Sequence, residues 1–158
     1  MAYLSTRFGK AIEQKVAAML LEEGRDVYLP TVDDHGVDIL VAPKISTGVK
    51  KASKENELVE LTTALGTQVS IYQELQVKAV TNGLFAAINC PDPRPNYWYV
   101  FYVKSVDTYW LINSMDFVNK ASQNVNGKNV GKYSLDLATK KGTKKHTQYI
   151  ITDFSRLP

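Results

Sequence analysis

The chain has 158 residues and a net charge of +3, and its 44% hydrophobic and 22% charged content is typical of a soluble globular protein. The single cysteine, Cys90, excludes an internal disulfide and a cysteine-based zinc site, and it favours a reducing, cytoplasmic environment. No apolar run approaches the roughly 20 residues needed to span a bilayer, and charged residues interrupt any signal-peptide core near the N-terminus. Neither a membrane role nor a signal peptide is therefore predicted.

Hydrophobic periodicity predicts one helix followed mainly by strands. Apolar side chains recur at helical spacing over residues 5–23, and Gly24 is a suitable C-terminal stop. The segments predicted as strands are residues 26–29, 37–41, 57–61, 69–80, 84–89, 97–103, 109–112, 133–137 and 147–151. A short helix is expected near Ser114, and loops are expected at residues 43–56, 122–131 and 139–146. Because no repeat or linker divides the chain, we expect one α/β domain over residues 1–158, with a mixed central sheet flanked by helices.

Two of these strand segments carry polar side chains in otherwise apolar runs. Asp38 opens the apolar run of the first, and Glu74, Gln76 and Lys78 alternate with apolar residues in the second. Strand geometry puts these last three polar groups on one face. A carboxylate, an amide oxygen and an ammonium that meet at the end of a sheet can hold a divalent cation beside a positive charge, as phosphodiester cleavage requires. Taken singly, each residue also fits an ordinary structural role.

Glu13 is an unusual residue of the predicted helix. On a helical wheel it lies inside the apolar arc, away from the charged side formed by Arg7, Gln14, Lys15 and Glu22. A carboxylate there must be paired, bound to a metal or placed at the edge of the core, because burying it alone is costly. The alternative is a boundary glutamate that reaches solvent.

The remaining candidates are less specific. His35 precedes Asp38 in a turn-rich stretch, and it is either a metal ligand or general base, or simply an exposed loop residue. Two lysine-rich loops are either solvated or contact a DNA backbone, where they would supply charge without sequence information. Their lysines are Lys50, Lys51, Lys54, Lys140, Lys141, Lys144 and Lys145.

Taken in chain order, three of these features resemble the PD-(D/E)xK nuclease superfamily. They are Glu13 on a helix, Gly36-Val37-Asp38 before a strand and Gln76-Val77-Lys78 on a later strand. The Gln-x-Lys form is most similar to Mrr-type restriction endonucleases, and the general layout is similar to archaeal Holliday junction resolvases. The resemblance covers residues 5–90 or so, and residues 97–158 would form a C-terminal extension of the sheet.

The chain departs from the superfamily pattern at two points. Asp38 precedes Gln76 by 38 positions, which is wider than a short hairpin, so the lysine-rich loop between them would be an insertion. Gln76 stands where a carboxylate is usual, which lowers the negative charge available to a metal. Glu74, on the same strand face, or Glu60 could compensate for that charge.

The resemblance implies a restriction-endonuclease-like fold and a metal-dependent DNA endonuclease that hydrolyses phosphodiester bonds. Asp38 and Gln76 would hold Mg²⁺, with Mn²⁺ as a substitute, and Glu13 would assist as a further ligand or acceptor. Lys78 would orient the attacking water and stabilise charge on the phosphorane oxygens. DNA is the expected partner, and cutting of both strands would favour a homodimer.

Two alternatives stay open at this point. A catalytically inactive domain of the same fold could bind nucleic acid or another protein, and both Gln76 and the modest net charge favour it. Gln76 and Lys78 could also be ordinary polar residues of a small metabolic α/β domain.

Overall fold

The computed structural model of the protein describes residues 2–31, 36–43 and 71–158. The strand predicted at residues 57–61 and nearly all of the loop predicted at residues 43–56 lie outside these ranges. Four candidate site residues and one candidate for charge compensation also lie outside them, namely His35, Lys50, Lys51, Lys54 and Glu60.

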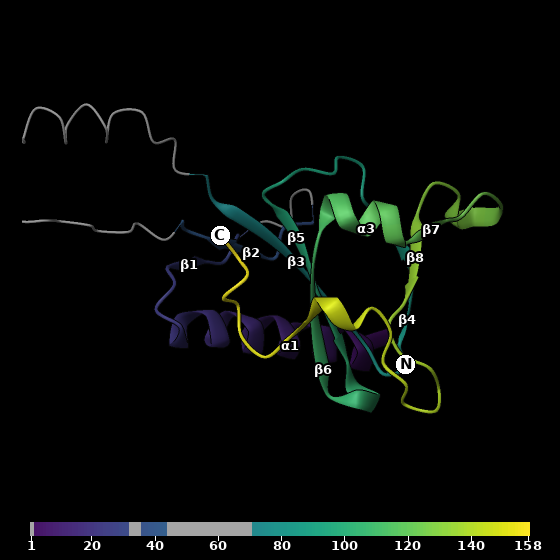
Figure 1. Ribbon diagram of the computed structural model, residues 1–158, viewed down its shortest axis with the longest axis horizontal. Coiled ribbons are helices and arrows are strands. Elements are labelled where there is room, and N and C mark those ends of the chain that lie inside the picture. The colour runs from purple at the N-terminus through teal and green to yellow at the C-terminus, as the bar shows by residue number, and fades with distance from the viewer. Residues whose placement is uncertain (1, 32–35, 44–70) are drawn as a thin grey trace, which may run out of the picture.

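The described residues form two α-helices, nine strands and three short 3₁₀ turns (Figure 1). The helices are α1 (Ala2–Glu22) and α3 (Ser114–Lys120), and the 3₁₀ turns are η1 (Lys104–Val106), η2 (Gly127–Asn129) and η3 (Thr147–Tyr149). The strands are β1 (Val27–Tyr28), β2 (Ile39–Val41), β3 (Gln73–Val80), β4 (Leu84–Ile88), β5 (Tyr97–Val103), β6 (Thr108–Asn113), β7 (Ser122–Gln123), β8 (Tyr133–Asp136) and β9 (Ile150–Ile151).

A six-stranded mixed sheet forms the centre of the molecule, in the order β1-β2-β3-β5-β6-β9. Its central pair, β3 and β5, is parallel, and every other pair in it is antiparallel. The chain between β3 and β5 leaves this sheet and contributes β4 to a second, three-stranded sheet in the order β4-β8-β7. The parallel pair brings the start of β3 beside the start of β5, with Glu74 opposite Tyr97.

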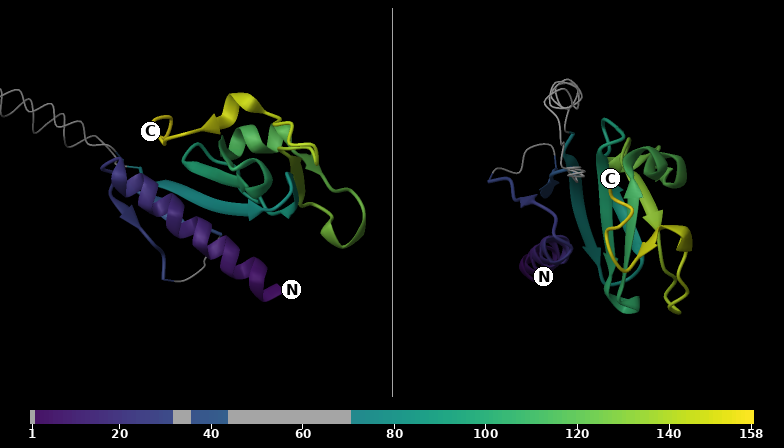
Figure 2. Two further views of the ribbon diagram at one scale, coloured as in Figure 1. Left: turned by 90° about the horizontal axis from the view of Figure 1, so that it is seen from below. Right: turned by 60° about the vertical axis from the view of Figure 1, so that its left-hand side comes forward.

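The two faces of the central sheet are covered by different elements (Figure 2). On one face, Ile12 and Val16 of α1 belong to the same buried cluster as Leu75 and Val77 of β3. On the other face, α3 and the small sheet cover an aromatic cluster that includes Tyr99. The predicted α/β class with a mixed central sheet flanked by helices is therefore confirmed.

The helix α1 follows the predicted periodicity. Ile12, Val16 and Leu20 are buried, whereas Glu22 on the opposite side is exposed. The helix ends as predicted before Gly24, which adopts a left-handed φ of 72°, a backbone conformation that glycine adopts without steric cost.

Three predicted segments differ from the structure. The strand expected at residues 69–80 begins only at Gln73, because Ile71 and Tyr72 are described outside β3. The strand expected at residues 147–151 is wrong over its first part, because Thr147–Tyr149 forms the 3₁₀ turn η3 and only Ile150–Ile151 pairs with β6. The turn is closed by a hydrogen bond from the Tyr149 N–H to the His146 carbonyl. The segment expected as a loop at residues 122–131 contains the short strand β7 and the turn η2.

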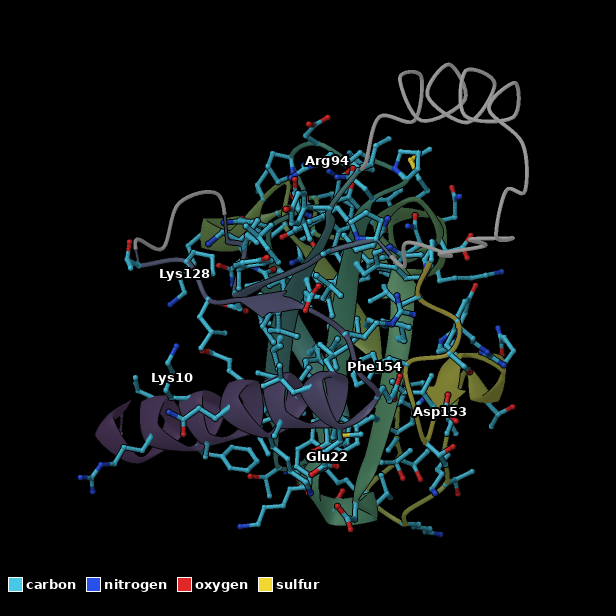
Figure 3. The ribbon with its side chains drawn as sticks, turned by 90° about the vertical axis from the view of Figure 1, so that its left-hand side faces the viewer. Lys10, Glu22, Arg94, Lys128, Asp153 and Phe154 are labelled. Atoms are coloured by element: carbon cyan, nitrogen blue, oxygen red, sulfur yellow. The ribbon has the colours of Figure 1, made fainter. Side chains whose placement is uncertain are left out.

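The C-terminal segment closes over the end of α1 (Figure 3). Arg25 is buried and donates hydrogen bonds to the carbonyls of Phe154, Leu157 and Pro158. The Glu23 carboxylate accepts a hydrogen bond of 2.7 Å from the Phe154 N–H. Residues of the tail thereby complete the core beneath α1, since the side chains of Phe154 and Leu157 are almost fully buried there.

We expect Gly83→Ala to lower the free energy of unfolding by roughly 1–3 kcal/mol, the range found for overpacked sites. A Cβ at this position would lie 2.2 Å from the backbone nitrogen of Ala138, and a backbone atom cannot move aside as the end of a side chain can. Gly9→Ala is the matched control, because a Cβ there meets nothing within 4 Å and alanine raises helix stability by up to about 1 kcal/mol. Urea denaturation of both variants measures their free energies of unfolding. Equal stabilities of Gly83→Ala and Gly9→Ala would contradict the prediction.

Candidate active site

The carboxylate of Asp38 lies against the centre of the Gln76–Lys78 segment. Its Oδ2 accepts a hydrogen bond of 2.7 Å from the N–H of Val77, and the Asp38 N–H donates to the Leu75 carbonyl at 2.9 Å. The pairing of β2 with β3 causes this contact, because Ile39 lies opposite Leu75 and the residue before Ile39 therefore reaches the next part of β3. The structure thus brings together the aspartate and the Gln-x-Lys segment that the sequence singles out.

Gln76 and Lys78 share the strand face opposite α1. Leu75 and Val77 belong to the core beneath α1, so alternation along β3 puts Gln76 and Lys78 on the other side. Within the described residues, neither the Gln76 amide nor the Lys78 ammonium makes a hydrogen bond or an ion pair, although Gln76 is only 8% exposed. Both polar groups are therefore available to a ligand.

Gly36 makes room for the Gln76 side chain. Gly36 has a φ of 71°, and a Cβ at this position would lie 2.3 Å from Gln76 Nε2. Its carbonyl accepts a hydrogen bond of 3.2 Å from the Tyr97 hydroxyl. Gln76 lines a pocket together with Gly36, and its amide oxygen is the atom that would bind a metal there.

Arg94 and Glu74 form an ion pair beside these residues. The Arg94 guanidinium also lies over the Tyr97 ring, 4.6 Å from its centroid. A pocket of about 470 Å³ opens here, lined by Gly36, Gln76, Asn89, Pro91, Asp92, Arg94 and Tyr97. The Glu74 carboxylate, a candidate accessory group, is thus engaged by Arg94.

The pKa of Tyr97 is influenced by charges on both sides of the site, Asp38 and Arg94. Burial is the main cause that raises its pKa to about 12, and the nearby Asp38 carboxylate adds to the rise, while Tyr99 and the Arg94 guanidinium oppose it. The Tyr97 phenol therefore stays protonated at neutral pH and continues to donate its hydrogen bond to Gly36.

Glu13 is partly buried, as its position on the helical wheel predicts, and its side chain is 20% exposed. Its carboxylate forms an ion pair of 2.6 Å with Lys10, one turn earlier in α1. Figure 3 shows Lys10 on α1 and Arg94 at the far end of the sheet. Among the described residues, Glu13 is joined to Lys10, and no hydrogen bond or ion pair links it to Gln76 or Lys78.

The second lysine-rich loop lies at the other end of β3. Leu137, just before the loop, donates its N–H to the Gly83 carbonyl, after the end of β3, whereas the Arg94–Glu74 pair is near its start. Lys145 forms an ion pair with Asp136. Lys140, Lys141 and Lys144 are exposed together with it, so this loop adds positive charge at the end of β3 away from Arg94.

The donor set at Asp38 and Gln76 fits Mg²⁺. A carboxylate and an amide oxygen are hard oxygen ligands, and Mg²⁺ is usually held by one or two such groups together with water and phosphate oxygens. In the part of the chain that the structure describes, no three side chains from histidine, cysteine, aspartate and glutamate gather as a metal site. Any metal here would therefore depend on the Gln76 amide as well as on Asp38.

Arg94 and Tyr97 are site residues that sequence reasoning misses. Tyr97 belongs to an aromatic strand that reads most simply as core, and Arg94 lies in a loop between two prolines. The sequence feature that could have indicated Arg94 is its place in a Pro-Arg-Pro segment just before the buried strand β5. That signal does not say which other residues Arg94 meets.

Comparison with known proteins supports the fold. No protein-family model matches the chain, and no curated protein matches it. A solved structure described as a bacterial homing endonuclease, I-Ssp6803I, is similar, with a TM-score of 0.50 and 18% sequence identity over 92% of this chain and 88% of that chain. At this identity the similarity shows a shared fold and no more. Within the described residues, no helix is long and apolar enough to cross a membrane.

Proposed function

We propose that the protein is a metal-dependent endonuclease that hydrolyses phosphodiester bonds in DNA. The contact between the Asp38 carboxylate and the Val77 N–H carries this proposal, because it sets a carboxylate, a suitable metal ligand, against a strand that presents an amide and an ammonium. The fold shared with a homing endonuclease supports the same reaction class. Fold alone does not imply function, so the proposal depends on the site.

Asp38 and Gln76 would hold the metal, and Lys78 would act on the phosphate. Held by these two residues, Mg²⁺ would supply polarisation of the scissile phosphate and a lower pKa for the attacking water. Lys78 has no competing partner among the described residues, so its ammonium is available to orient that water and to stabilise charge on the phosphate oxygens. The Val77 N–H holds the Asp38 carboxylate in one orientation before substrate binds.

The accessory parts of the proposal concern Glu13 and the lysine loops. Glu13 would accept a hydrogen bond from metal-bound water only after exchanging its ion pair with Lys10. Lys140, Lys141 and Lys144 are exposed and would contact the DNA backbone beyond the end of β3. Lys50, Lys51 and Lys54 would add a second basic segment, and cutting of both strands would need a homodimer.

A domain that binds DNA without cutting is the second candidate. Gln76 is neutral, and Arg94 already engages the Glu74 carboxylate, so Asp38 supplies most of the negative charge that would attract a cation here. A site with less negative charge binds Mg²⁺ more weakly.

Metal-dependent cleavage of DNA tests the proposal directly. Supercoiled, linear and branched DNA are incubated with the protein in Mg²⁺, in Mn²⁺ and in EDTA, and products are separated on gels. We expect nicked or linear products with either metal and none in EDTA, because the reaction needs the cation at Asp38. DNA that is bound but never cut in Mg²⁺ or Mn²⁺ would favour the non-cleaving domain instead.

A further inference from the structure

The backbone at Arg94 is fixed on both sides. Its N–H donates to the Ser114 hydroxyl, and that hydroxyl donates to the Arg94 carbonyl, each at 2.8 Å. Ser114 is fully buried, and the Asn113 amide donates to the Pro95 carbonyl at 2.8 Å. Pro93 and Pro95 flank Arg94 and restrict the loop further. The backbone from which the Arg94 side chain extends is therefore held in a defined position.

The guanidinium is also directed by its contacts. Tyr97 supports its face. Glu74, the Asp92 carbonyl and the exposed Asp92 carboxylate, at 3.4 Å, each accept a hydrogen bond from it. The side chain remains 30% exposed and lines the pocket that also contains Gln76. A guanidinium has five N–H donors, so these three acceptors leave donors that can meet a ligand in the pocket.

We infer that Arg94 binds a backbone phosphate of DNA, next to the phosphodiester held at Asp38 and Gln76. The inference rests on the proposed function and adds a phosphate-binding residue to that site. Arginine suits this task because its planar fork matches two phosphate oxygens at once. Glu74 keeps the guanidinium in place in the free protein and competes with the phosphate for it.

A purely structural role for Arg94 makes the opposite prediction. If the ion pair with Glu74 only ties the loop to β3, then removing either partner should change DNA affinity in the same direction, by loosening the same loop. If Arg94 binds phosphate, Arg94→Ala weakens DNA binding, whereas Glu74→Gln strengthens it by removing the competing carboxylate. The two variants therefore distinguish the roles by the sign of their effects.

The test measures affinity for duplex DNA by fluorescence anisotropy, in EDTA and over a series of salt concentrations. We expect Arg94→Ala to weaken binding roughly tenfold or more, as for a lost hydrogen bond to a charged group. The slope of log K against log salt should become shallower by about 0.9, the value for one phosphate contact. Glu74→Gln should tighten binding roughly two- to fivefold, in line with loss of a partly exposed ion pair.

Arg156→Ala is the matched control, since Arg156 is exposed and does not line the pocket. Its salt slope should equal that of the wild type. An unchanged slope for Arg94→Ala, or weaker binding by Glu74→Gln, would overturn the inference. Because the measurement is made in EDTA, wild-type binding without an Arg94 effect leaves the proposed endonuclease intact, whereas absence of any DNA binding by the wild type overturns both.

Discussion

We expect Asp38→Ala to reduce DNA cleavage by on the order of 10³-fold or more while leaving DNA affinity unchanged or slightly higher. The substitution removes the carboxylate that would hold the metal, and metal-ion catalysis is worth several kcal/mol of transition-state stabilisation. It also removes a negative charge that repels phosphate. Gel-based cleavage rates and anisotropy binding curves, measured on the same DNA, separate the two effects.

Asp38→Asn is the sharper form of the same experiment. An asparagine keeps an oxygen that can accept the hydrogen bond from the Val77 N–H, so the local fold is preserved while the charge is lost. Asp153→Ala serves as a control, because Asp153 is exposed and lies away from the pocket lining. Cleavage by Asp38→Asn at the wild-type rate would contradict the assigned role of Asp38.

The second large effect is expected for Lys78→Ala, which should slow cleavage on the order of 10²-fold or more. The ammonium would stabilise charge that develops on the phosphate oxygens in the transition state, so its loss lowers the rate far more than the affinity. Single-turnover rates at saturating protein measure this directly.

Lys78→Met controls for packing, because methionine keeps much of the aliphatic stem and loses the charge. It should be as slow as Lys78→Ala. Lys128→Ala removes an exposed lysine elsewhere on the surface and should cut at the wild-type rate. A Lys78→Met protein that cuts normally would assign Lys78 a structural role.

The elements with strong periodicity were predictable from the sequence. The aromatic strand β5 has the predicted bounds, Tyr97–Val103, because it consists entirely of aromatic residues and valine, which favour strands. The helix α1 differs by a few residues at its start. The 3₁₀ turn at Thr147–Tyr149 was not predictable, because it depends on His146, which precedes it with a left-handed φ of 50°, a conformation that the local sequence does not signal.

The candidate site was predictable only where residues lie close in sequence or share a strand face. Alternation in β3 puts Gln76 and Lys78 together, and an antiparallel neighbour brings Asp38 to them. Arg94 was not predictable, because it meets Glu74 through the parallel register of β3 and β5. Nothing in the local sequence specifies that register, which depends on how the intervening β4 and its loop pack.

The C-terminal tail has a consequence for how the chain folds as it is synthesised. Arg25 and Glu23, made early, hold Phe154 and its neighbours, and the side chains of Phe154 and Leu157 fill the space beneath α1. A nascent chain that lacks these residues leaves part of the core beneath α1 unfilled and leaves the Arg25 guanidinium without its three carbonyl acceptors, which is costly. The α1 side of the core can therefore close completely only after residues 154–157 have been synthesised and have left the ribosome.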